Sequence, residues 1–165
     1  MHFHTAITVV LGSAGFSLGD IVSVSLPSGF FEGPQTGIGS WFRSTNDGTN
    51  GNSWCSYPYY DSDPVFAVAG KYCGLEAKVK DSATGKTKLM YIGDAFDDAW
   101  VRVIKVDDQP LSNSANASLK TPASIDIMID AFSEIHGSPN NDKNDVINDV
   151  EWELTGNSNT EFAAS

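Results

Sequence analysis

Basic residues are scarce in this chain. Its 165 residues include 10 Lys and Arg against 21 Asp and Glu, which gives a formal net charge of -11 at pH 7. A negative field of this size repels phosphate, so it argues against binding to nucleic acid or to an anionic membrane. It does not oppose a neutral polymer such as a polysaccharide.

Cysteine and histidine are also rare. The two cysteines and three histidines match no zinc-binding spacing, and we expect no metal site and no cofactor. Cys55 and Cys73 are either two buried thiols or one disulfide. We favour the disulfide, because other features of the sequence indicate secretion. In the chain-entropy model, closing a loop of this size stabilises a fold by roughly 3 kcal/mol.

Long hydrophobic runs are absent. The apolar stretch "AITVVLGSAGFSLG" is too short and too rich in glycine to span a membrane. Small residues near its end are typical of a signal peptide, here residues 1–19, although residues 1–4 carry no Lys or Arg. The alternative is an ordinary N-terminal strand. A glycosylation sequon at Asn116 also fits a secreted, extracellular protein.

The rest of the chain reads as one domain over residues 20–156, followed by a disordered tail over residues 157–165. Short runs of β-branched and aromatic residues alternate with Gly, Asn, Asp and Pro, which predicts a mostly β barrel or sandwich. The expected strands are residues 20–26, 37–42, 64–70, 76–81, 86–93, 100–106 and 150–156.

One helix is expected near the C-terminus. Ser124 to Ile127 leads into it, and Ile129, Phe132 and Ile135 share one helical face. Gly137 is placed to end the helix.

Five short motifs between residues 73 and 152 occur in an order that resembles that of a known family. They are Cys73-Gly74, the hairpin "DSATGK" at 81–86, Gly93-Asp94, the segment 125–132 with Ile125-Asp126-Ile127 and Ala131-Phe132, and Val150 with Trp152. Together with the opening "GIGSWFRS", this order resembles the double-psi β-barrel of the rare lipoprotein A-like, expansin and loosenin group. The resemblance implies a six-stranded double-psi β-barrel with one short helix and added loops.

The resemblance also implies a polar site. Asp126 would lie at the floor of an open groove, with Asp94 and the Ser40 hydroxyl nearby. Two close carboxyl groups raise the pKa of one of them, which can then donate a proton near neutral pH. Plainer alternatives exist: Asp126 as the N-cap of the helix, Asp94 as a solvated turn residue, and Ser40 as an ordinary surface residue.

In the family, the opening strand carries a Thr, and Ser40 stands at its position in "GIGSWFRS". Endoglucanases that resemble this barrel carry a catalytic base four residues after that Thr. Ser44 stands at that position here, and Asp47 is a poor substitute. The missing base resembles the non-hydrolytic expansins and loosenins. We therefore expect a secreted monomer that binds cellulose, chitin or a related glucan and loosens it without cutting it.

Aromatic residues are candidates for sugar binding, because aromatic rings stack on sugar rings. Trp54, Tyr57, Tyr59 and Tyr60 surround Cys55, and Trp41 follows Ser40. We expect Trp41 or Tyr59 to be exposed, although packing in the core is the commoner fate of aromatic side chains. The expected core aromatics are Phe42, Phe66, Phe132 and Trp152.

Two other functions stay open. The chain is a glycoside hydrolase or lytic transglycosylase if Asp126 alone acts as general acid. It is a protein-binding module, such as a protease inhibitor or effector, if the loops at 44–53 and 107–120 carry binding and Asp126 is dispensable.

Overall fold

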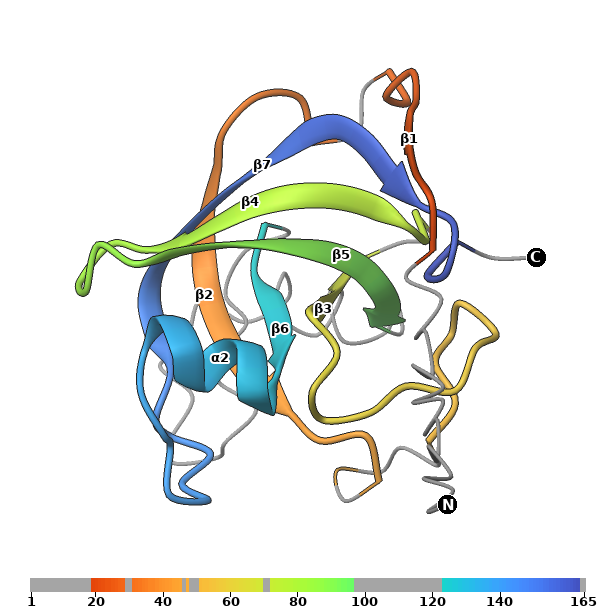
Figure 1. Ribbon diagram of the computed structural model, residues 1–165. Coiled ribbons are helices and arrows are strands. Elements are labelled where there is room, and N and C mark those ends of the chain that lie inside the picture. The colour runs from red at the N-terminus through yellow and green to blue at the C-terminus, as the bar shows by residue number, and fades with distance from the viewer. Residues whose placement is uncertain are drawn as a thin grey trace, which may run out of the picture.

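The computed structural model describes residues 19–28, 31–45, 47, 51–69, 72–96 and 123–163. These residues form a mostly β fold with one short helix, as expected (Figure 1). The elements are β1 (Ile21–Ser23), β2 (Gln35–Phe42), β3 (Val65–Ala69), β4 (Leu75–Asp81), β5 (Thr87–Phe96), β6 (Ile125–Met128), α2 (Ile129–Ile135) and β7 (Ile147–Asn159).

Six of the strands close into a barrel. Their order is β7-β2-β6-β3-β5-β4, and β4 pairs back onto β7. The pairs β2–β6 and β3–β5 are parallel, whereas the other pairs are antiparallel. β1 lies outside the barrel and pairs with the end of β7 (Figure 1). A closed, mixed, six-stranded barrel is compatible with the double-psi barrel that the sequence predicts.

The helix follows the sequence pattern. Ile129, Phe132 and Ile135 are buried in the main core, and the chain turns at Gly137 with a φ of 132°. The N-cap is Met128 and makes no side-chain capping bond. Asp126 lies within β6, so the N-cap alternative for Asp126 is wrong.

Residues 157–163, the part of the tail that the structure describes, are ordered and not disordered as expected. β7 continues to Asn159, and Phe162 is only 4% exposed. The ring of Phe162 packs against Tyr57 and Tyr91, with centroid separations of 5.2 and 5.3 Å. Strand pairing and the burial of this ring together hold a segment whose polar composition predicts disorder.

Cys55 and Cys73 form the expected disulfide, with a Cα–Cα distance of 5.5 Å. It ties the loop before β3 to the start of β4. Beneath this loop lies a second apolar cluster, formed by Phe42, Tyr59, Val65, Met128 and Phe162. The loop is thus anchored both covalently and by apolar packing.

Some expectations fall outside the described residues. These are nearly all of the predicted signal peptide, the strand at 100–106 and the sequon at Asn116. In the part of the chain that is described, no helix is long and apolar enough to cross a membrane.

Candidate functional site

Four polar or small residues form one row across the barrel wall. Ser40 on β2 is in register with Asp126 on β6, and Asp126 is in register with Ala67 on β3. Ala67 is in turn in register with Asp94 on β5. Residues in register share a sheet face, and neighbouring strands lie about 4.8 Å apart. The two aspartates therefore flank one alanine, about 10 Å apart at their Cα atoms.

A β-bulge places Asp94 in this row. Phe66 pairs with Ile92, but the next residue, Ala67, pairs with Asp94, so Gly93 is the extra residue. Without the bulge, Asp94 would share the core-facing side of Ile92 because strand side chains alternate. Gly93 is required here, since a Cβ would lie 2.7 Å from the Cβ of Val65, which is fixed to the backbone of β3.

Asp126 has an unusual electrostatic environment. Its Oδ1 accepts a hydrogen bond of 2.9 Å from the Ser40 hydroxyl, the one hydrogen bond of this side chain among the described residues. Burial raises the pKa of Asp126 to about 7, and the charges of Asp47 and Asp94 act in the same direction. Ser40 and Lys143 oppose this rise. Below pH 7 the carboxyl is mostly protonated, so it can donate a hydrogen bond or a proton.

Asp94 is held differently. Its Oδ1 accepts the backbone N–H groups of Trp54 and Ala95 at 2.8 and 2.9 Å, and its Oδ2 accepts the Tyr59 hydroxyl at 3.2 Å. The Trp54 side chain is 55% exposed. The backbone of this exposed residue is thus bound to an acceptor carboxylate.

The other aromatic candidates divide between surface and core. Tyr60 is 65% exposed, whereas Trp41 and Tyr59 are 3% and 2% exposed, so the expectation that one of these two is exposed is wrong. Tyr57 is half-buried, and its hydroxyl has no hydrogen-bond partner among the residues that the structure describes. Tyr59 is buried because its ring meets Phe42 edge-on in the second cluster. The four expected core aromatics, Phe42, Phe66, Phe132 and Trp152, are buried.

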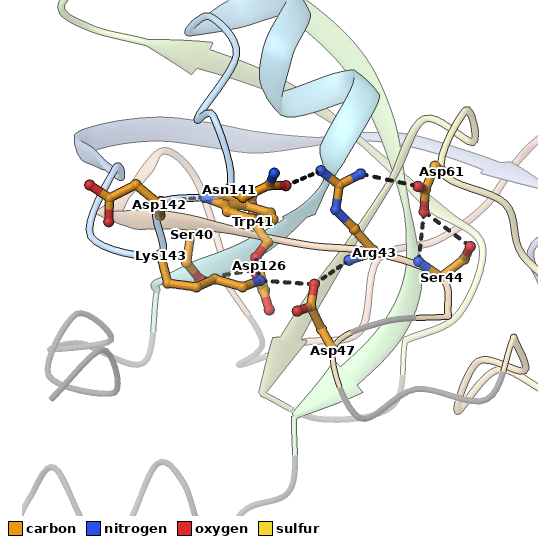
Figure 2. A network of polar contacts seen from close by, with 10 residues as sticks. All are labelled: Ser40, Trp41, Arg43, Ser44, Asp47, Asp61, Asp126, Asn141, Asp142 and Lys143. Atoms are coloured by element: carbon orange, nitrogen blue, oxygen red, sulfur yellow. Dashed lines mark hydrogen bonds and ion pairs between the residues drawn. The ribbon is translucent and has the colours of Figure 1, made fainter.

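Trp41 is buried beneath a cation. The Lys143 Nζ lies 3.7 Å from the centre of the Trp41 ring and donates to the Trp41 carbonyl at 2.8 Å. The same ammonium pairs with Asp47 Oδ2 at 2.9 Å (Figure 2). Sequence reasoning missed Lys143, since a lysine in a polar loop about 100 residues from Trp41 carries no local signal.

Ser44, at the position of the missing base, is hydrogen-bonded to Asp61. Its hydroxyl and its backbone N–H both donate to Asp61 Oδ1, at 3.0 and 2.8 Å. Arg43 lies 3.5 Å from the other oxygen of Asp61 (Figure 2). Asp47, besides its pair with Lys143, accepts the Arg43 backbone N–H at 2.8 Å. The two negative charges that act on Asp126, those of Asp47 and Asp94, are therefore both held by hydrogen-bond donors.

The row combines a carboxyl with a raised pKa, a hydroxyl and an acceptor carboxylate, and the backbone of the exposed Trp54 binds that carboxylate. Such a set can exchange hydrogen bonds with hydroxyl groups, and Asp126 can donate a proton. In the described ranges, no group of three or more His, Cys, Asp or Glu is arranged to hold a metal ion.

The chain was compared with models of known protein families and with curated proteins, and it matches none of them.

Proposed function

We propose that this protein is a secreted polysaccharide-binding protein of the rare lipoprotein A-like, expansin and loosenin type. It binds a glucan or chitin chain across the outer face of β2, β6, β3 and β5. The single observation that supports this most is the row in which Asp126 and Asp94 flank Ala67. Ala67 projects little between them, and Trp54 adds a ring for stacking.

Binding of a neutral polymer accounts for the charge and the groups in the row. Sugar hydroxyls are both donors and acceptors, so they match a protonated Asp126 and the acceptor Asp94 together. The net charge of -11 disfavours a phosphate polymer. The disulfide supports an oxidising, extracellular compartment.

The state of the neighbouring carboxylates favours loosening without cleavage. Glycoside hydrolysis needs a base or nucleophile besides the acid. Asp47 is occupied by Lys143 and the Arg43 N–H, and Asp94 by its own donors. The protein then acts by competition: it binds one chain and displaces the contacts of that chain with its neighbours.

One observation favours a second function. A carboxyl with a pKa of about 7 is poised to act as a general acid. A glycoside hydrolase or lytic transglycosylase that uses Asp126 alone is therefore the rival proposal.

Retention on insoluble cellulose, chitin and peptidoglycan tests the binding proposal. We expect Trp54→Ala to weaken binding roughly tenfold, because it removes the exposed stacking surface. Leu89→Ala is the matched control, since Leu89 is also exposed on the barrel but lies away from the row. An equal loss of binding in both variants would contradict the proposal. Failure of the wild type to bind any of these glycans would also contradict it.

Release of reducing sugar separates loosening from cleavage. We expect no release by the wild type, and binding that weakens above about pH 7 as Asp126 loses its proton. Asp126→Asn should remove this pH dependence, whereas Glu153→Gln, which removes one negative charge from an exposed site on β7, should keep it. Release by the wild type that is lost in Asp126→Asn would establish the rival.

A further inference from the structure

The segment between α2 and β7 reaches across to the end of β2. Lys143 belongs to this segment, and its ammonium binds the Trp41 carbonyl, the Trp41 ring and Asp47 (Figure 2). The Trp41 indole N–H donates to the Asp142 carbonyl at 3.2 Å. Trp41 is thus fixed by both its backbone and its ring to a segment about 100 residues away.

The contacts of Lys143 with Trp41 and Asp47 lie next to the candidate site. Trp41 directly follows Ser40, whose hydroxyl binds Asp126. Asp47 holds the strand end from the other side, through the Arg43 N–H. The Asp47–Lys143 pair therefore binds the backbone at Trp41 and Arg43, directly after Ser40 in the chain.

The pair also acts on Asp126 through charge. The groups that face Asp126 are Ser40 from β2, Asp47 from the loop after β2, Lys143 from the segment before β7, and Asp94 from β5. Lys143 lowers the pKa of Asp126, whereas Asp47 raises it. The side chains of Lys143 and Asp47 are 37% and 22% exposed, so neither charge is fully screened by water.

We propose that Asp47 and Lys143 are positioning residues of the Asp126 site, which fix the end of β2 beside that carboxyl and balance the charge around it. The inference deepens the proposed polysaccharide-binding function, on which its biological meaning rests. Its own test needs no polysaccharide.

The test is a ¹³C NMR titration of the Asp126 carboxyl between pH 4 and pH 9, in the full chain. In Lys143→Met we expect the midpoint to rise by about one pH unit, because a nearby cation is lost. In Asp47→Asn we expect it to fall by about one pH unit, because a nearby anion is lost. The double variant should titrate near the wild type.

Two controls separate this role from general loosening of the fold. Lys143→Arg keeps the cation and should restore the wild-type midpoint, and Lys88→Met breaks an ion pair with Glu134 elsewhere and should not move it. If Lys143→Met does not fold, the Asp47→Asn midpoint decides alone. Shifts of the same sign in the two single variants, or no shift in folded Asp47→Asn, would overturn the inference.

The outcome is independent of the proposed function. Opposite shifts without retention on any glycan would reject polysaccharide binding and keep the positioning roles. Retention of the protein on a glycan, with unchanged Asp126 midpoints in the variants, would keep polysaccharide binding and reject the positioning roles.

Discussion

Two aspartates on the barrel, Asp81 and Asp126, respond to burial in opposite ways. Asp81 ends β4 and its side chain is 0% exposed, yet its pKa lies below the usual value. Asp126 is half-buried on β6, and its pKa is raised to about 7. Burial alone therefore does not decide the charge of a carboxyl in this protein.

The hydrogen-bond partners explain the contrast. Burial opposes ionisation of Asp81, but its bonds with His136 and with the turn outweigh that cost. Oδ2 lies 2.8 Å from His136 Nδ1, and Oδ1 accepts the Ala83 N–H at 2.8 Å. Asp126 has the Ser40 hydroxyl as its one such partner in the described chain. Asp81 is thereby held as an anion within the fold, whereas the pKa of Asp126 stays raised.

The largest change in stability should come from removing the hydrogen-bonded carboxylate of Asp81. We expect Asp81→Asn to lower the free energy of unfolding at pH 7 by about 3 kcal/mol, because it removes one partner of a buried pair. Urea unfolding measures this. The depressed pKa stabilises the fold above about pH 4, and this contribution is lost as the pH falls below that value. A deficit that stays constant from pH 7 to pH 2 would contradict the contrast.

The opposite sign is expected at Asp126. Its raised pKa costs stability as the pH rises from about 4 to about 7, because the unfolded chain ionises first. Three pKa units correspond to about 4 kcal/mol, and access of water to the site should reduce the gain in Asp126→Asn to about 2 kcal/mol at pH 8. Urea unfolding at pH 4 should show no gain. An equal effect at both pH values would argue against a neutral carboxyl.

The smallest effect concerns the Ser40 bond. This bond lowers the pKa of Asp126, so Ser40→Ala should raise the titration midpoint of Asp126, by about half a pH unit. Carboxyl ¹³C NMR measures it. Ser133→Ala, which removes a hydroxyl bonded to the Ile129 carbonyl, is the matched control and should leave the midpoint unchanged. A fall in the midpoint in Ser40→Ala would show that another donor replaces Ser40.

Local features of the fold were predictable where neighbours in sequence determine them. The hairpin turn holds Asp81, whose carbonyl accepts the N–H of Gly85, and Gly85 adopts a φ of 72°. Alternation and turn residues predict such a turn. β6 was harder, because its four residues run directly into α2 and their pattern reads as the lead-in to a helix.

Part of the candidate site was also predictable, and part was not. The ordered resemblance indicated Asp126, Asp94 and Ser40, and the register brings them into one row. The burial of Trp41 was missed, since an aromatic at a strand end carries no mark of which distant side chain covers it. Lys143 covers it here.

The sequence by itself determined the excess of negative charge, the apolar face of the helix and most strands, because composition and short-range periodicity encode them. Only the tertiary structure decided which polar residues lie in one row. Ser40 and Asp126 are 86 residues apart, and strand alternation specifies a face but not a neighbouring strand. The strand order of the closed barrel places β2, β6, β3 and β5 side by side. The extra residue at Gly93 brings Asp94 into register with Ala67, on the outward face.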